Sequence, residues 1–462
     1  MAAKEKGIWG LLDKFEGDKV IWMIVILLIL MSLVSVFSST PLLALEQGGD
    51  RIAIVREQLI IAVVGLLVIT ACYNIRSIGF FRLFAQLGYA VSLLLLVCLV
   101  AKVRTPVIRA AEINGAWRIL KVFGLQIHVY EVVKVAMVMY LAWAVNALRE
   151  DSFTAANYLS TKFKRLSFLS RTFWKKLIYI YFPIVSICVL MLHGGTSSTL
   201  FFAMIMFLVI YVGGVRLNEV ALLALVVAGY VALVVGLYKA SAGRIKLSDR
   251  IVTAIGRVDD RSEDNMTIIT SSPRNSKAFQ DALDKEKQPV SAMIAIKEGG
   301  LLGKGPGRST QRYVVPVIFG DYMYSFIVEE YGILGGIFVI ILYVSLLARG
   351  AMIAKDCDNY FAKVAVAGLI LLISSQAIMH IAINVHLVPQ TGQTLPMISH
   401  GASSFLVFSI AFGIILSISR MVRVKMKRKE RDAQPILVRE EERPRDEVHD
   451  TISDLNDFQD TI

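Results

Sequence analysis

The sequence has little charge and few cysteines for its length. Asp, Glu, Lys and Arg make up 19% of the 462 residues and hydrophobic residues 56%, whereas a soluble domain carries about 25% charged residues. The four cysteines lie in apolar runs or a short loop and predict no disulfide framework; they are Cys72, Cys98, Cys188 and Cys357. No small-residue cleavage site follows the first apolar run, 20–38, so we expect it to stay as a helix. These absences argue against a soluble protein and against a disulfide-stabilised one.

The formal net charge of +12 would suggest nucleic-acid binding in a soluble protein. Here the basic residues lie mostly in loops, without the interleaved aromatic residues that a nucleic-acid platform needs. Membrane topology and anionic lipid head groups explain them better. We therefore expect membrane lipids as partners and no nucleic acid. The six histidines show no metal-ligand spacing, and we interpret His380 and His400 as packed helix residues.

About ten apolar runs approach the roughly 20 residues that a transmembrane helix needs. They lie near 20–39, 58–75, 83–101, 131–148, 177–193, 198–215, 218–238, 322–348, 361–385 and 403–420. The count is uncertain by one, because only HGGTSS interrupts the region 177–215. The sequence thus predicts an all-α polytopic integral membrane protein, with about ten transmembrane helices and one large extracytoplasmic loop between helices 7 and 8.

Lysine and arginine in the short loops predict the orientation. They are concentrated before the first helix, in the loop 149–176 and after the last helix, which places both termini in the cytoplasm. The loops 102–130 and 239–320 then face outward. The predicted divisions are a cytoplasmic N-terminus (1–19), helices 1–7 (20–238), the outer loop (239–320), helices 8–10 (321–420) and a charged cytoplasmic tail expected to be disordered (421–462).

The outer loop is too long for a passive connector. Its second half is apolar at helical spacing from Val290 to Ile296, which predicts a helix, 290–303, in or dipping into the membrane interface. GGLLGKGPG follows, but it lacks the GxxxxGK[ST] spacing and a preceding strand, which rejects a nucleotide site. Its backbone amides, with Lys304 nearby, suit an anionic head group.

Asp321 ends this loop at the start of an apolar helix. An acid at a membrane boundary is costly and is a functional candidate. One interpretation is a helix N-cap, because an Asp there accepts a backbone N–H and complements the helix dipole. The other is a general base, whose pKa the boundary between membrane and water raises. The two roles are compatible.

Four further charged residues lie in apolar runs. We interpret Glu329 and Glu330 as structural pairing partners rather than chemical groups. Glu131 and Lys134, three residues apart on one helix face, form either a simple ion pair or a pair that faces a cavity.

The uncharged loop 387–404, LVPQTGQTLPMISHGASS, is rich in Pro, Gly and hydroxyl groups. It predicts a re-entrant, tightly packed turn.

Four stretches of this sequence resemble the SEDS family (shape, elongation, division and sporulation), which includes FtsW and RodA. They are NGAWRILKVFGLQIHVYEVVK (114–134), AIKEGGLLGKGPGRSTQR (295–312), GDYMYSFIVEEYGILGG (320–336) and the region 376–420. The resemblance is strongest to the division-type branch, FtsW, with elongation-type RodA second. The chain departs from the family pattern at 128–130 (HVY), at 193–198 (HGGTSS, without an aspartate) and at 317–320 (VIFG, without a histidine).

The resemblance implies a peptidoglycan glycosyltransferase that polymerises lipid II during septal cell-wall synthesis. Asp321 would be its catalytic base, with a divalent cation (Mg²⁺ or Mn²⁺) as a candidate cofactor and no organic cofactor. The candidate substrate-binding residues are Arg56, Arg118, Glu131, Lys134, Lys304, Gln311, Ser399 and Ser403.

The same resemblance implies partners and a location. The partners are lipid II, a class B penicillin-binding transpeptidase and other proteins of the division machinery. The location is the bacterial inner membrane at the septum. Three alternatives stay open: a RodA-like polymerase of cell elongation, a lipid II flippase and a non-catalytic scaffold for division proteins.

Overall fold

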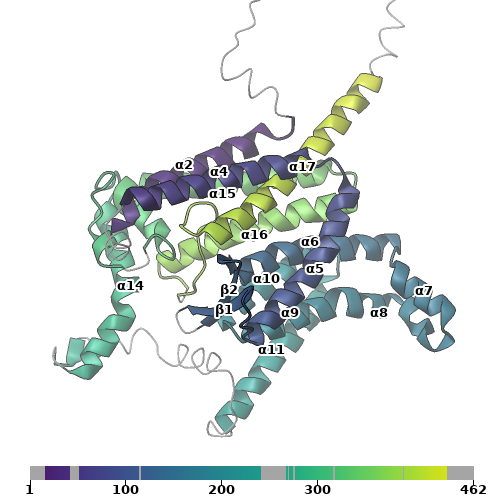
Figure 1. Ribbon diagram of the computed structural model, residues 1–462, viewed down its shortest axis with the longest axis horizontal. Helices are drawn as coiled ribbons and strands as arrows, with labels where there is room; N and C mark the ends of the chain where they lie inside the picture. The colour runs from purple at the N-terminus through teal and green to yellow at the C-terminus, as the bar shows by residue number, and fades with distance from the viewer. Residues whose placement is uncertain are drawn as a thin grey trace, which may run out of the picture.

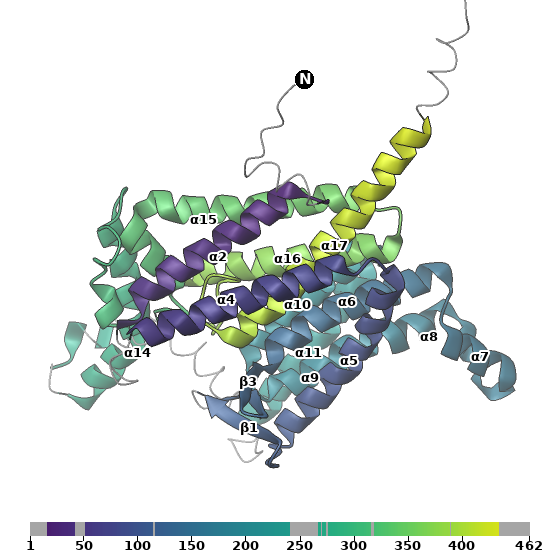
Figure 2. The same cartoon turned by 45° about the horizontal axis from the view of Figure 1, so that its top comes forward.

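The computed structural model describes residues 16–41, 51–113, 116–240, 267–268, 270–273, 276–315, 318–388 and 390–433. Over these residues the chain forms a bundle of long helices (Figures 1 and 2). Eight helical segments of the described chain are long and apolar enough to cross a membrane. They are α2 (Lys19–Ser39), α4 (Arg51–Asn74), α5 (Ile78–Val100), α6 (Val129–Glu150), the continuous segment Thr172–Leu192, α15 (Met323–Asp356), α16 (Tyr360–Asn384) and α17 (Ala402–Ala433). Two further apolar helices are α10 (Thr196–Val212) and α11 (Leu217–Ala240).

These helices confirm the predicted all-α polytopic membrane fold. The segment Thr172–Leu192 consists of α8 (Thr172–Lys176), a π-helical turn (Leu177–Tyr181) and α9 (Phe182–Leu192). HGGTSS does separate two helices, because α9 ends at Leu192 and α10 begins at Thr196. The last helix continues to Ala433, well beyond the predicted boundary at 420, and the rest of the tail lies outside the described residues.

The loop 102–130, which is predicted to face outward, contains a small antiparallel sheet that was not predicted. Its strands are β1 (Ile108–Ile113), β2 (Ala116–Val122) and β3 (Leu125–His128), in the order β1-β2-β3. Phe123 and Gly124 join β2 to β3 with φ angles of 49° and 84°, as a tight two-residue hairpin requires. The sheet places Arg118 on β2 and delivers the chain directly into α6.

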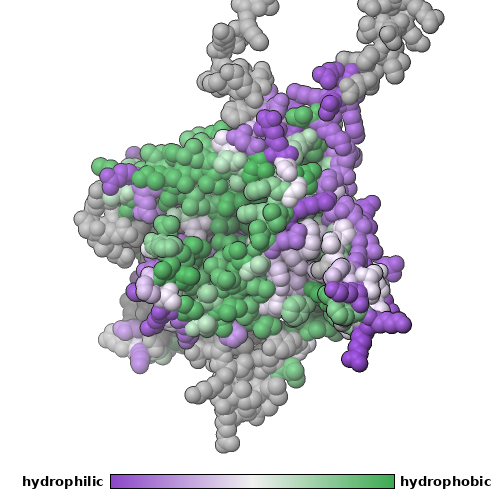
Figure 3. Space-filling view, turned by 45° about the vertical axis from the view of Figure 1, so that its right-hand side comes forward, coloured by the Kyte–Doolittle hydropathy of each residue, from purple (hydrophilic) through white to green (hydrophobic). Residues whose placement is uncertain are grey.

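The surface of the bundle is apolar where a membrane would contact it. Figure 3 shows a broad hydrophobic area on one face, with hydrophilic residues gathered toward its margins. Large apolar side chains on several helices are exposed there or on other faces, among them Leu30 at 52%, Leu67 at 63% and Leu200 at 74%. Contiguous exposed apolar surface of this extent is expected of a lipid-facing protein.

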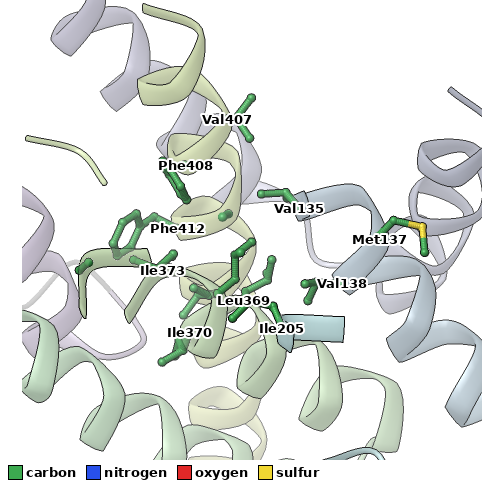
Figure 4. Packing of buried hydrophobic residues seen from close by; sticks show 14 of the residues in the cluster. Val135, Met137, Val138, Ile205, Leu369, Ile370, Ile373, Val407, Phe408 and Phe412 are labelled. Carbon is green, nitrogen blue, oxygen red and sulfur yellow. The ribbon is translucent and has the colours of Figure 1, made fainter. Parts of the chain in front are cut away.

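The centre of the bundle is filled by side chains from α6, α10, α16 and α17. In the close view of Figure 4, Val138, Ile205 and Leu369 converge from three of these helices, and Phe408 packs from α17. All four side chains are fully buried. This part of the core contains apolar side chains from every helix that borders it.

Two further helical regions lie at opposite ends of the bundle (Figures 1 and 2). α14 (Lys277–Gly299) is at one end, and α7 (Thr154–Lys162), followed by a 3-10 turn (Lys164–Ser170), is at the other. α14 begins earlier than the predicted helix 290–303. Its Ala292 and Ala295 are buried, while Met293 and Ile294 are exposed. α14 packs against α15, so its buried face contacts protein.

Candidate functional site

Asp321 lies in the turn that precedes α15, and its side chain does not cap that helix. The N-cap residue of α15 is Tyr322, which makes no side-chain cap hydrogen bond. Within the described residues, no hydrogen bond reaches the Asp321 carboxylate. The N-cap interpretation of Asp321 is therefore wrong, and its carboxylate is available for chemistry.

The surroundings of Asp321 favour its neutral form. The side chain is half-buried, and this burial raises the pKa of Asp321 to about 6, while the charge of Arg118 opposes the shift. A carboxyl group with that pKa is mostly ionised at neutral pH and still basic enough to accept a proton.

Arg118 is held beside this acid by the turn between α9 and α10. Its Nε donates a hydrogen bond of 3.1 Å to the carbonyl of Gly194. A Cβ atom at Gly195 would lie 2.8 Å from Nη2 of Arg118, and one at Gly392 would lie 3.3 Å from Nη1. The glycines of HGGTSS and of the loop 387–404 thus allow both segments to approach the guanidinium closely.

Lys134 is the centre of a second polar cluster. It is buried in α6, and its Nζ donates to Oε1 of Glu131 at 2.8 Å, of Gln376 at 2.5 Å and of Gln393 at 3.2 Å. The predicted pair of Glu131 and Lys134 is confirmed. Oε2 of Glu131 is buried without a hydrogen-bond partner in the described chain. The two glutamines were missed, although a glutamine inside an apolar run (Gln376) is itself a signal.

The loop 387–404 packs tightly around the turn of Asp321, as predicted. The backbone N–H of His400 donates to the carbonyl of Phe319 at 3.0 Å, and the hydroxyl of Ser399 donates to that of Gly320 at 2.8 Å. The hydroxyl of Ser403 accepts a hydrogen bond from the backbone N–H of His128 at 2.9 Å. The structure thus places the hydroxyl groups of Ser399 and Ser403 in contacts with the backbone.

The glycine-rich loop binds carboxylates of its own chain. The N–H of Gly307 donates to Oε1 of Glu330 at 3.0 Å, and the N–H of Thr310 donates to Oε1 of Glu329 at 2.8 Å. Nζ of Lys304 pairs with the same oxygen of Glu329 at 2.8 Å. Both glutamates are fully buried. Their predicted structural role is confirmed, and the anion that these amides bind is internal, where the sequence suggested a lipid head group.

Three predicted residues lie apart from Asp321. Lys304 is held at the glycine-rich loop, and Gln311 follows it, buried, at the start of a 3-10 turn (Gln311–Tyr313). Arg56 is exposed on α4. In the described part of the chain, no hydrogen bond or ion pair joins any of the three to Asp321. The structure thus brings Arg118 to the acid and places Glu131 and Lys134 in the neighbouring cluster.

The described residues contain no group of three or more His, Cys, Asp or Glu side chains that could hold a metal ion. Asp321 is the acid of the site, and Glu131 is already paired with Lys134. The described residues around Asp321 therefore do not form a set of ligands for a resident metal ion. We assign no chemical step to the predicted divalent cation.

Related proteins match most of the chain. Stage V sporulation protein E of Bacillus subtilis (strain 168) is 26% identical over 414 residues, which cover 89% of this chain and 99% of that protein. A probable peptidoglycan glycosyltransferase FtsW of Trichlorobacter lovleyi is 27% identical over 411 residues, covering 87% of this chain and 93% of the relative.

Solved structures share the fold. The structure described as "Structural coordination of polymerization and crosslinking by a peptidoglycan synthase complex" contains a chain that matches with a TM-score of 0.59 and 19% identity, covering 87% of this chain and 98% of that one. Rod shape determining protein RodA of Thermus thermophilus matches with a TM-score of 0.52 and 20% identity, covering 87% of this chain and 97% of RodA.

The family that comprises FtsW, RodA and SpoVE, described as "Cell cycle protein", matches residues 18–424. This match includes the helices from α2 through α16, the sheet, the turn of Asp321 and α17 as far as Val424. The chain is therefore a multi-pass membrane protein that belongs to the FtsW/RodA/SpoVE family of cell cycle proteins.

Proposed function

We propose that this protein is a peptidoglycan glycosyltransferase that polymerises lipid II, with Asp321 as its general base. The observation that carries the proposal is the state of the Asp321 carboxylate. It does not cap α15 and is half-buried beside Arg118, and its burial raises the pKa of Asp321 to about 6. Membership of a family with members named peptidoglycan glycosyltransferase supports the same activity.

In the proposed reaction, Asp321 accepts the proton of the 4-hydroxyl group of the acceptor sugar. The oxygen attacks the anomeric carbon of the donor, and a new glycosidic C–O bond forms. The bond from that carbon to undecaprenyl pyrophosphate breaks, and the pyrophosphate leaves with the electron pair. In this proposal Arg118 stabilises the developing negative charge, because a positioned cation acts strongly where water is excluded.

A lipid II transporter is the rival function, and the core of the bundle argues against it. A transporter needs polar groups through the depth of the membrane. One helical turn after Lys134, α6 carries Val138, which lies beside the apolar side chains of Ile205 on α10 and Leu369 on α16 (Figure 4). The polar cluster therefore occupies one part of the bundle, as a one-sided active site requires.

We further propose a division role, like that of the FtsW branch, at the septum, with a class B penicillin-binding transpeptidase and other division proteins as partners. The fold shared with a chain of a peptidoglycan synthase complex supports a transpeptidase partner. In this proposal both termini lie in the cytoplasm. The rival roles are elongation, as in RodA, and a non-catalytic scaffold.

The test measures two activities of the same vesicles. Purified protein and its transpeptidase partner are reconstituted with lipid II, and glycan strands and lipid II translocation are both measured. Asp321→Ala is compared with Glu112→Ala, which removes an exposed acid on β1. We expect strands from wild type and Glu112→Ala and none from Asp321→Ala. Translocation without strands in the wild type would identify a transporter, and neither activity would identify a scaffold.

A further inference from the structure

The first turn of α15, next to Asp321, is capped by residues of another helix. The first backbone N–H groups of a helix have no partner within it. Two of those in α15 donate to side chains of α16: the N–H of Tyr324 to Nε2 of His380 at 3.3 Å, and the N–H of Ser325 to Oδ1 of Asn384 at 2.9 Å. Both α16 side chains are buried, with exposed fractions of 0% and 1%.

The amide of Asn384 also holds the backbone of Asp321 itself. Its Nδ2 donates to the carbonyl of Asp321 at 3.1 Å and to that of His380 at 2.8 Å, while Oδ1 accepts from both the N–H and the hydroxyl of Ser325. A flipped amide would direct its NH₂ group at the N–H of Ser325 and its oxygen at two carbonyls. The hydrogen bonds therefore permit only one orientation of the Asn384 side-chain amide.

The hydrogen bonds of His380 fix its tautomer in the same way. Its Nδ1 lies 2.8 Å from the carbonyl of Gln393, which can only accept, so Nδ1 carries the proton. Nε2 is then the acceptor that the N–H of Tyr324 requires, and the ring is neutral. The side chain of Gln393 in turn accepts from Lys134. His380 thus links the Lys134 cluster to the start of α15.

The carbonyls of three consecutive residues, Phe319, Gly320 and Asp321, receive donors from the region that ends α16 and precedes α17. The donors are the N–H of His400, the hydroxyl of Ser399 and Nδ2 of Asn384. No side chain of the turn itself supplies these bonds. The direction of the Asp321 side chain is consequently set by α16 and the loop after it.

We propose that His380 and Asn384 are positioning residues for the reaction, which hold the Asp321 carboxylate in its direction and in its partly dehydrated environment. Asn384 acts through the carbonyl of Asp321 and the N–H of Ser325, and His380 through the N–H of Tyr324. This inference rests on the proposed role of Asp321 as the base.

The test uses substitutions that keep volume and remove hydrogen bonds. Asn384→Leu removes all the side-chain bonds of Asn384, and His380→Phe removes the acceptor at Nε2. His380→Gln is the rescue variant, because its amide oxygen can occupy the position of Nε2. Asn146→Leu is the matched control: Asn146 is equally buried in α6, where it bonds Glu150. Folding is checked by thermal unfolding, and kcat, KM for lipid II and the pH profile are measured with the transpeptidase partner present.

We expect Asn384→Leu and His380→Phe to lower kcat at least tenfold with KM changed less than twofold. The acid limb of their pH–rate profiles should shift to lower pH than in the wild type, because a loosened turn lets water reach Asp321 and lowers its pKa. His380→Gln should recover to within about threefold of wild type, and Asn146→Leu should keep the wild-type acid limb. A purely structural role would lower the amount of folded protein and leave kcat per folded molecule and the acid limb unchanged.

The inference is overturned if folded Asn384→Leu and His380→Phe show the wild-type kcat and acid limb, or if His380→Gln is as slow as His380→Phe. Should Asn384→Leu fail to fold, Asn384→Ser, which is too short to reach the Asp321 carbonyl, is judged by the same criteria. Asp321→Asn is measured in parallel. Full activity of that variant would refute Asp321 as the base and, with it, the positioning role of His380 and Asn384. An inactive Asp321→Asn variant, together with Asn384 and His380 variants of wild-type activity, would refute the positioning role alone.

Discussion

Replacing Asp321 by asparagine is expected to stabilise the folded protein at neutral pH while removing the proposed base. Burial raises the pKa of Asp321 from 3.8 to about 6, a shift of about 2 units that corresponds to about 3 kcal/mol at about 1.4 kcal/mol per unit. Asp321 is only half-buried, so solvent screening reduces this to about 1–2 kcal/mol.

The sign follows from proton binding. The folded state holds the proton of Asp321 more tightly than the unfolded state does, so stability falls as the pH rises from about 4 through about 6. Above that range the full cost of the ionised carboxylate is present. Asparagine has a similar shape and no charge, and it avoids this cost.

The assay is thermal unfolding of wild type and Asp321→Asn in lipid nanodiscs at pH 5 and pH 8, with Glu112→Gln as the control. A gain of this size raises the unfolding temperature by about 1–3 °C in a chain of this length. The gain should be larger at pH 8 than at pH 5, and absent in the control. An Asp321→Asn variant that is less stable than wild type, or equally stabilised at both pH values, would refute the reasoning.

Three further predictions concern activity and the glycine-rich loop. The polymerisation rate should fall as the pH drops through about 6, where Asp321 becomes protonated; a pH–rate profile with its midpoint near 4 would contradict this. Gly332→Ala should destabilise the folded protein by about 3 kcal/mol, because Gly332 has a φ of 71° and the Cβ of an alanine there would collide with backbone atoms of Leu301 and Gly303. An unchanged denaturation midpoint would contradict this prediction. Lys304→Met should cost about 2–4 kcal/mol by leaving buried Glu329 without its cation, whereas the exposed Lys297→Met should cost little, and equal effects of the two would count against the pairing.

The sequence predicted the membrane helices well, because each one must present a long apolar run to lipid. The positions of these helices could be predicted because the length of an apolar run is a local property of the sequence. The sheet at β1–β3 was missed, because its strands are short and sit in a loop where apolar and basic residues alternate irregularly. The start of α14 was also missed, since its first half is polar and includes Pro289.

The site was predicted as far as local sequence determines it. The position of Asp321 at a helix start and the pair of Glu131 and Lys134 are short-range features. The capping of α15 by His380 and Asn384 joins residues far apart in the chain, and no local pattern indicates it. For the same reason, the sequence indicated that the amides of the glycine-rich loop suit an anion, but not that the anion is Glu329 and Glu330.

The most direct test of the account is the initial rate of lipid II polymerisation by wild type and Asp321→Asn, each purified with the transpeptidase partner and assayed at pH 7.5. General-base catalysis contributes about 10²–10⁴-fold, so we predict a loss of at least about a hundredfold in a variant that is folded, binds its partner and is more stable than wild type. A folded Asp321→Asn variant that polymerises lipid II at the wild-type rate would contradict the assignment of Asp321 as the base.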